Sequence, residues 1–283
     1  WDTAVAAGNP VGMGLGLKNS GLGNGANEVS RSTVRFDPDG TIEVRHCWTE
    51  MGQGIHTVAR QVAVEELGVE PDRIKVVVDT TRELGAGQTT GSRGTVMGAG
   101  SVADACQNAM AGGCEEGVEY AGVYVVDWTN SINDGLENPV IHSTFGYAAQ
   151  LVELDPETGE IAKVVAAHDV GRAVNPLLCE GQIEGAVHMG LGYALTEGFP
   201  CDEHGKPLNE TLRSLDIIRP KDMPPTEVVL VESPDPNSPY GIKGVGEIGL
   251  VPTAGAVAAA LHAHDGEWRH ELPMRTERNR ERA

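Results

Sequence analysis

Glycine is the residue that most constrains this sequence. The 283-residue chain contains 37 glycines, whereas aromatic residues make up only 4% of it. An ordinary soluble domain has about 7% glycine. Because glycine lacks a Cβ, it lets the backbone approach a neighbouring surface or a ligand closely. The composition therefore predicts backbone in close contact with a neighbouring surface or a ligand, rather than a core filled by large aromatic rings.

The chain is strongly acidic, with 21 Lys and Arg against 41 Asp and Glu and a formal net charge of -20. Phosphate recognition needs clustered basic residues, so we expect neither a nucleic-acid partner nor an anionic membrane surface. A length of 283 residues suits one large domain or two modest ones, and 40% hydrophobic residues argue against disorder. No apolar run reaches the roughly 18 residues that cross a bilayer, so no membrane insertion is expected.

The 5 cysteines are scattered singly, without a CxxC pair or the spacing of a zinc or iron–sulfur site. Such residues are typical of buried thiols in a reducing compartment, which predicts a cytoplasmic protein. The histidines also lack metal-ligand spacing, so no metal-binding residue is predicted. The chain opens at Trp1 without an initiator Met, and we expect a processed or truncated product.

Hydrophobic periodicity predicts an α+β chain in which one order of elements occurs twice. A hairpin with the turn DPDG is followed by the loop EMGQG and a helix over residues 55–67. Later, a hairpin with the turn DPETGE is followed by the loop GQIEG at 181–185 and a helix over 186–195. We interpret this order as an internal repeat of two cofactor-binding halves, 1–142 and 143–283, with coincidence as the alternative.

Other segments complete the expected order of elements. The glycine-rich residues 11–25 suit a strand or a loop, and residues 74–78 suit a short buried strand. A helix of small residues is expected over 96–110, followed by an irregular region with one strand-like stretch, GVYVVDW. A proline-rich stretch, 219–239, precedes the loop YGIKGVGEIG, and a last helix begins near Pro252.

Three glycine loops, EMGQGIHT, TTGSRGT and GQIEG, are each expected at the start of a helix. Helix N-termini offer unpaired N–H groups and a positive dipole end, which suit an anionic ligand even in an acidic protein. The amides of Gln53 and Gln182 can donate and accept hydrogen bonds, as a heterocycle requires. The loops indicate a buried, polar, anionic cofactor, with ordinary turns at helix starts as the alternative. The sequence has no P-loop, GxSxG or HExxH motif.

Glu247, in GVGEIG, is the predicted catalytic residue. Its flanking glycines leave the carboxylate unshielded, so a bulky cofactor and a substrate can approach it. Burial there would raise its pKa toward the value that a general base needs. An exposed glutamate in a turn is the alternative interpretation.

Four long segments occur in an order that resembles a known family. They are EMGQGIHTVARQVAVEELG, TTGSRGTVMGAGSVADAC, HDVGRAVNPLLCEGQIEGAVHMGLGYAL and GIKGVGEIGLVPTAGAVAAAL. Together they resemble the C-terminal half of the molybdopterin-binding subunit of xanthine oxidase/xanthine dehydrogenase family molybdenum hydroxylases. The resemblance covers essentially the whole chain. It implies a molybdenum-cofactor-binding domain of the aldehyde oxidase/xanthine dehydrogenase type.

The resemblance also implies roles for individual residues. Glu247 matches the family's active-site glutamate, which removes a proton from a hydroxyl on molybdenum. The metal is held by the cofactor's dithiolene, so no ligand from the chain is expected. Lys18 and Asn19 lie where the family places substrate-facing residues, but the alignment has gaps there and they are not assigned to the site. The positions that match the family's cofactor-binding segments are Met51, Gly52, Gln53, Gly91, Ser92, Arg93, Gly94 and Gln182.

The activity implied is oxidation of an electron-poor C–H of a purine or another N-heterocycle, with oxygen from water. The cofactor would be molybdenum–molybdopterin, expected as the cytosine dinucleotide with a terminal sulfido or selenido ligand. Electrons would leave through 2Fe-2S clusters and FAD on partner subunits. The other half of the molybdenum-binding subunit is a further expected partner, because this chain matches only one half. Alternatives are an aldehyde or carbon monoxide dehydrogenase subunit, or a non-catalytic cofactor-binding or assembly subunit.

Overall fold

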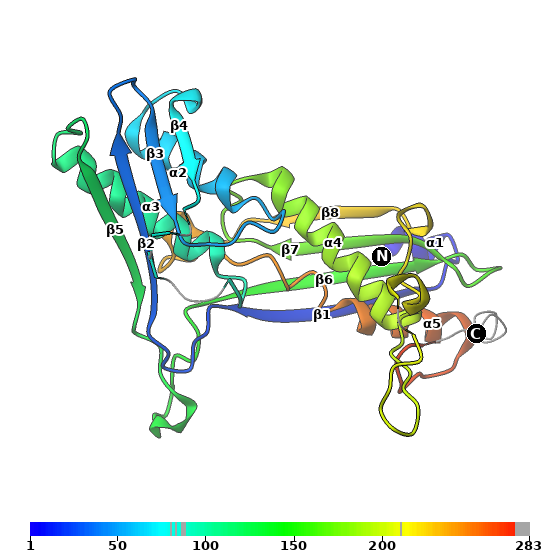
Figure 1. Ribbon diagram of the computed structural model, residues 1–283. Coiled ribbons are helices and arrows are strands. Elements are labelled where there is room, and N and C mark those ends of the chain that lie inside the picture. The colour runs from blue at the N-terminus through cyan, green and yellow to red at the C-terminus, as the bar shows by residue number, and fades with distance from the viewer. Residues whose placement is uncertain (80, 83, 86–88, 210, 275–283) are drawn as a thin grey trace.

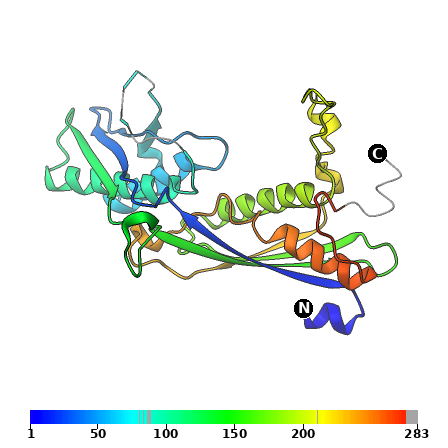
Figure 2. The ribbon, with the colours of Figure 1, turned by 90° about the horizontal axis from the view of Figure 1, so that it is seen from below.

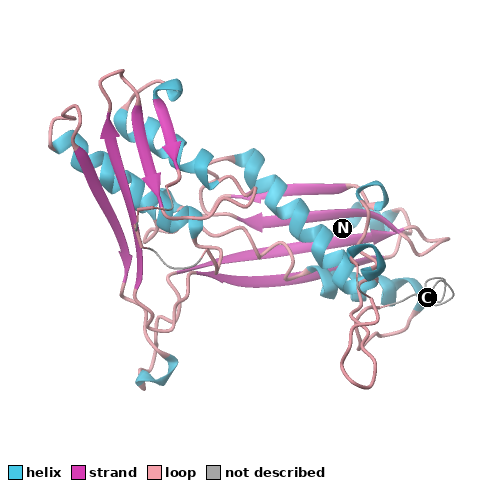
Figure 3. Cartoon of the chain, viewed as in Figure 1, coloured by secondary structure: helices cyan, strands magenta, loops and turns pink. Residues whose placement is uncertain are grey.

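The chain folds into two lobes, each built on one four-stranded sheet (Figures 1 and 3). The computed structural model describes residues 1–79, 81–82, 84–85, 89–209 and 211–274. The strand orders are β4-β3-β2-β5 in one sheet and β1-β6-β7-β8 in the other. The elements are α1 (Asp2–Ala6), β1 (Val11–Ser20), β2 (Glu28–Phe36), β3 (Ile42–His46), α2 (Ile55–Leu67), β4 (Ile74–Val77), α3 (Gly94–Ala111), β5 (Glu119–Val126), β6 (Thr144–Leu154), β7 (Ile161–Asp169), α4 (Pro176–Leu195), β8 (Thr226–Val231) and α5 (Thr253–Asp265).

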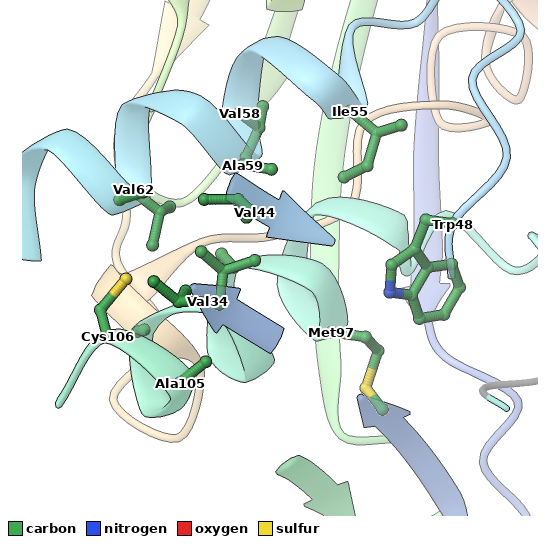
Figure 4. Close-up of a cluster of buried hydrophobic side chains, with 14 of the residues drawn as sticks. Val34, Val44, Trp48, Ile55, Val58, Ala59, Val62, Met97, Ala105 and Cys106 are labelled. Carbon is green, nitrogen blue, oxygen red and sulfur yellow. The ribbon is translucent and has the colours of Figure 1, made fainter. Parts of the chain in front are cut away.

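The first lobe is the expected hairpin, covered on one face by two helices. β2 and β3 pair antiparallel with Val34 opposite Val44, and both side chains are fully buried. The helix predicted over 55–67 is confirmed as α2, which places Val58 and Val62 against this face and ends at Gly68 in a left-handed conformation. Figure 4 shows these side chains meeting others from α3 in one apolar core.

In the second lobe, α4 and α5 lie on one face of the sheet β1-β6-β7-β8 (Figure 2). The glycines of β1 explain how closely α5 approaches. A Cβ at Gly12 would lie 2.1 Å from the backbone nitrogen of Ala260, and one at Gly14 would lie 2.2 Å from the carbonyl oxygen of Pro252. The helix therefore packs directly on the strand backbone, which is the close contact that the glycine content predicts.

The two lobes share one topology. In each, an antiparallel hairpin leads into a helix and then into a strand parallel to the second hairpin strand, as β3-α2-β4 and as β7-α4-β8. The repeat expected from the sequence is thus confirmed at the level of topology. However, β1 pairs with β6, so the two sheets are not divided at residue 143. The assignment of one cofactor-binding half to each side of that boundary stays a prediction.

The helix α4 begins ten residues earlier than the sequence predicted. The helix begins at Pro176, not near residue 186, and Asn175 caps it by accepting a 3.0 Å hydrogen bond from the backbone N–H of Leu178. The segment GQIEG therefore lies inside the helix and is not a loop before it. Its glycines favoured a loop, but Ile183 is fully buried and anchors this turn in the core of the lobe.

Two smaller differences concern strands and helix ends. The proline-rich stretch 219–239 contains β8, an additional strand that pairs with β7. The helix expected over 96–110 begins two residues earlier, as α3, because the loop before it ends at Arg93. Within the described part of the chain, no helix is long and apolar enough to cross a bilayer.

Candidate functional site

A cavity of about 360 Å³ lies where the two lobes meet. Its walls come from the loop before α2, the loop before α3, the first turns of α4 and residues 242–247. Gly52, in the loop before α2, is not among the described lining residues. All the other predicted site residues line the cavity: Met51, Gln53, Gly91, Ser92, Arg93, Gly94, Gln182 and Glu247.

Close backbone packing holds the loops of the two lobes together beside this cavity. The backbone N–H of Gly21, just after β1, donates a 2.8 Å hydrogen bond to the carbonyl oxygen of Gly91. The backbone N–H of Gly244 donates a 2.8 Å hydrogen bond to Ser20 Oγ. A Cβ at Gly244 would lie only 2.0 Å from the carbonyl oxygen of Ser92, so only glycine allows this contact.

Glu247 is held by two side chains from distant parts of the chain. Ser92 Oγ donates a 2.7 Å hydrogen bond to Glu247 Oε2, and Lys18 Nζ lies 3.2 Å from the same oxygen. Burial raises the pKa of Glu247, but the hydrogen bonds from Ser92 and Lys18 and the charge of Lys18 outweigh burial, so the pKa lies below its usual value. The expected rise in pKa is therefore wrong, because 52% of the side chain is exposed and a cation lies beside it.

The glycines of the loop before α2 suggested an anion-binding site at the start of the helix, but a carboxylate of the chain itself occupies that position. Glu50 accepts hydrogen bonds from the backbone N–H groups of Gly52, Gly54 and His56, at 2.8, 2.9 and 3.1 Å. The start of α2 is thus already capped by a carboxylate of the chain itself. The amide of Gln53 is also engaged within the loop, since it accepts from the N–H of Met51 and donates to the carbonyl of Thr49.

The start of α3 and one turn of α4 offer polar groups to the cavity. No side chain of the described residues caps α3, and its first residues, Gly94 and Thr95, line the cavity. Gln182 projects from α4, and its amide has no hydrogen-bond partner among the residues that the structure describes. A Cβ at Gly246 would lie 3.9 Å from Gln182 Oε1 and 3.5 Å from Ser92 Oγ, so these polar groups converge near Glu247.

Arg93 is buried, and its guanidinium binds a buried carboxylate. Arg93 Nη1 donates a 2.6 Å hydrogen bond to Glu28 Oε2, and its guanidinium carbon lies 5.4 Å from the ring centroid of Trp48. Glu28 Oε1 in turn accepts from the backbone N–H groups of Leu22 and Gly23. Arg93 therefore joins the loop before α3 to the segment after β1, which is a structural role that its sequence motif did not indicate.

The cavity is more basic than the chain as a whole. Its lining includes Arg93, Arg172 and Lys243, with Glu247 as the one carboxylate among the described lining residues. Lys243 Nζ binds Asp169 Oδ2 at 2.6 Å, whereas Arg172 is exposed at the cavity. Glu28 neutralises Arg93 and Asp169 neutralises Lys243, so the exposed Arg172 is the lining cation that suits an anionic ligand.

A family model described as "Molybdopterin cofactor-binding domain" matches residues 4–115 and 110–224. The chain belongs to this family. The resemblance that its four motifs indicated is thereby confirmed.

Relatives of this molybdopterin cofactor-binding domain are subunits of oxidoreductases. This chain is 30% identical to 6-hydroxypseudooxynicotine dehydrogenase complex subunit gamma of Paenarthrobacter nicotinovorans, over 96% of this chain and 39% of that protein. It is 28% identical to a Bacillus subtilis protein named as a probable xanthine dehydrogenase subunit, over 94% of this chain and 41% of that protein. Its structure matches the aldehyde oxidoreductase from Desulfovibrio gigas with a TM-score of 0.83 and 26% identity, over 96% of this chain and 32% of that one.

The residues at the cavity fit a molybdopterin cofactor. Such a group is a polar, anionic heterocycle, and the cavity offers amide and hydroxyl side chains, an uncapped helix start and an exposed guanidinium. Gly91 has a positive φ of 65°, and a Cβ there would lie 3.0 Å from the carbonyl oxygen of Gly21. Glycine at this position therefore lets the loop before α3 pack closely against the segment after β1. The described residues contain no group of three His, Cys, Asp or Glu that could hold a metal ion.

Lys18 is the residue that the sequence analysis left out of the site. It lies on β1, far from Glu247 in the sequence, and no local motif marks it. The only signal was the family resemblance, which places Lys18 in the glycine-rich segment 11–25 among substrate-facing residues, where the alignment has gaps. The structure brings its ammonium to Glu247 because β1 runs along α5 and ends beside the GVGEIG loop.

Proposed function

We propose that this chain is the part of a molybdenum hydroxylase that supplies the general base, Glu247, and one wall of the cofactor site. The observation that carries the proposal is that Ser92, Gln182 and Glu247, from three family motifs, line one cavity. The chain spans about two fifths of the length of the curated relatives it matches. The activity of the whole enzyme therefore depends on parts outside this chain.

Glu247 is oriented so that one oxygen is free to take a proton. Ser92 and Lys18 both contact Oε2, and Oε1 has no partner among the described residues. The pKa of Glu247 lies below its usual value, so the carboxylate is ionised at neutral pH and can accept the proton at Oε1. The bound molybdenum–molybdopterin supplies the two-electron redox chemistry. In this chain Gln182 and the start of α3 would bind the cofactor.

The substrate we propose is an N-heterocycle with an electron-poor C–H, a purine or a related ring. Relatives named for nicotine derivatives and for xanthine support this class. An aldehyde is the second candidate, because the aldehyde oxidoreductase structure matches this chain with a TM-score of 0.83. The carbon monoxide dehydrogenase structures match at 20% identity and support the fold alone.

The remaining components are part of the same proposal. We infer a cytosine dinucleotide form of the cofactor with a terminal sulfido or selenido ligand, and 2Fe-2S and FAD groups on partner subunits. The names of relatives as subunits of a complex support the existence of partners. A cytoplasmic location is consistent with the free cysteines of the described chain and stays a prediction.

Glu247→Gln in the intact enzyme complex tests the proposal. The variant keeps the size of the side chain and removes its ability to accept a proton, so turnover should fall by about 10² to 10⁴. Molybdenum content, measured on the same preparation, should stay near that of the unmodified complex. Glu184→Gln, on the exposed face of α4 near Gln182, is the matched control and should keep full turnover. Normal turnover in Glu247→Gln would refute a role as general base.

A further inference from the structure

The two sheets differ in the chemistry of the faces that their helices leave open. On the sheet β4-β3-β2-β5, the open face carries ion pairs. Glu43 Oε2 lies 2.9 Å from Arg35 and 2.9 Å from Arg45, and Arg45 also contacts Asp79 at 3.1 Å. This is the ordinary character of a sheet face in water. The open face of the other sheet is apolar along β1 and across its centre, and the ion pair of Lys163 and Glu227 lies toward the end where β1 begins.

The apolar face begins on β1. The glycines at even positions of β1 face α5, so the alternate side chains, Met13, Leu15 and Leu17, point to the opposite side. Their exposed fractions are 46%, 76% and 56%. Three large apolar side chains in a row on one strand form an exposed stripe that water-facing sheets normally avoid.

The stripe continues across all four strands. In the strand register, Leu15 lies opposite Ala149, Ala149 opposite Ala167, and Ala167 opposite Val229. Leu17 lies opposite Tyr147, which is 60% exposed. Of the described helices, Figure 2 shows α4 and α5 on the other side of this sheet and the short α1 on this side, at the end where β1 begins. We call this surface the open face.

The open face extends to the cavity. Tyr147 lies near its end, and Lys243 Nζ is 5.8 Å from the centroid of the Tyr147 ring. Lys243 also lines the cavity and binds Asp169, the residue that ends β7. A polypeptide that covers the open face therefore reaches the cavity without a break. This continuity favours an occupant that completes the cofactor site.

We propose that the open face is the docking surface for the part of the molybdenum-binding subunit that lies outside this chain. The matched relatives are more than twice as long as the aligned region, since this chain covers 39% of one and 32% of another. That additional polypeptide must pack against this one, and the apolar centre of the open face, on a chain of net charge -20, suits an apolar partner rather than a cationic one. The inference rests on family membership and on the proposed incompleteness of the site.

Cysteine labelling of the intact native complex tests this docking surface. Leu15→Cys places a thiol at the centre of the open face, and Val123→Cys places one on β5, on the open face of the other sheet. Both sites are exposed in this chain, so neither substitution opens its core. Labelling by a small maleimide is followed for each peptide by mass spectrometry, with the urea-unfolded complex as the reference for the intrinsic rate. A photoreactive maleimide on Leu15→Cys then identifies the neighbouring polypeptide.

The proposal predicts that Leu15→Cys is labelled about tenfold or more slowly in the native complex than in the unfolded one. It also predicts cross-links to the part of the molybdenum-binding subunit outside residues 1–283. Labelling at the unfolded rate would show an open surface and overturn the proposal. Cross-links to a second copy of residues 1–283, or to an iron–sulfur or FAD subunit, would overturn it as well. None of these readouts depends on Glu247, so they fail or succeed independently of the proposed base.

Discussion

Lys18 Nζ lies 3.2 Å from Glu247 Oε2, on the side of the carboxylate that Ser92 also binds. The ammonium thus stabilises the ionised form of the candidate base and leaves its other oxygen available. A base that is already ionised well below neutral pH needs no further deprotonation before a substrate arrives. We therefore expect Lys18 to position Glu247 and to extend to lower pH the range in which the proposed base can act.

Lys18→Met should shift the acid side of the pH profile. The pKa of Glu247 now lies below its usual value because of Ser92 and Lys18, despite partial burial, so removing the cation raises it. The fall in kcat/KM at low pH should then move to higher pH by about one unit. Lys163→Met, which removes a surface ion pair with Glu227, is the control. If the profiles of Lys18→Met and the unmodified complex coincide, Lys18 does not tune the base.

Gly244→Ala should loosen the junction of the lobes beside the cavity. The new Cβ would lie 2.0 Å from the carbonyl oxygen of Ser92 and 2.5 Å from Ser20 Oγ, so one of the two loops must move. We expect a loss of about 1 to 3 kcal/mol in the free energy of unfolding and a lower cofactor content. Gly255→Ala on α5 has open space around its Cβ and should stabilise the protein by about 0.5 to 1 kcal/mol. Equal unfolding curves for both variants would contradict this packing.

Arg93→Met should be strongly destabilising. The substitution leaves Glu28 buried without its cation, and such a loss costs about 3 to 5 kcal/mol in the free energy of unfolding. The double variant Glu28→Gln/Arg93→Met removes the buried charge and should recover part of that loss. Arg219→Met, which breaks an exposed ion pair with Asp222, should cost less than about 1 kcal/mol. Chemical denaturation of the variants measures each value, and a small effect at Arg93 would argue against this buried pair.

Acid should destabilise the fold through two buried histidines. Burial lowers the pKa of His168 to about 4, and burial together with the charge of His56 lowers the pKa of His46 to about 4. Unfolded histidines bind a proton near pH 6.5, so stability present above that pH is lost as the pH falls toward 4. Each histidine should contribute about 2 to 3 kcal/mol to this loss.

Variants at these positions separate the two histidines from the general effect of acid. His168→Gln should flatten the dependence of the free energy of unfolding on pH between 6.5 and 4. His204→Gln should leave it unchanged, because the His204 side chain is 81% exposed. A slope for His168→Gln as steep as that of the unmodified protein would show that His168 is not buried in its neutral form.

The sequence by itself determined the local elements and the family. The helix α2, the two hairpins and the helix after Pro252 follow from periodicity, turn residues and caps within a few neighbouring positions. The four motifs also identified segments that meet at the cavity, although GQIEG lies in a helix and not in a loop. These features depend on short-range preferences, which a sequence carries directly.

Only the tertiary structure decided the environment of the site. The helix α4 continues through residues 181–185 because Ile183 is buried, although the local glycines favoured a loop. The pKa of Glu247 is lowered because Ser92 and Lys18 lie beside it, although burial was expected to raise it. The membership of β1 in the second sheet depends on pairing with β6. Each of these outcomes depends on contacts between residues far apart in the chain, and neither hydrophobic periodicity nor turn chemistry encodes which distant segments pack together.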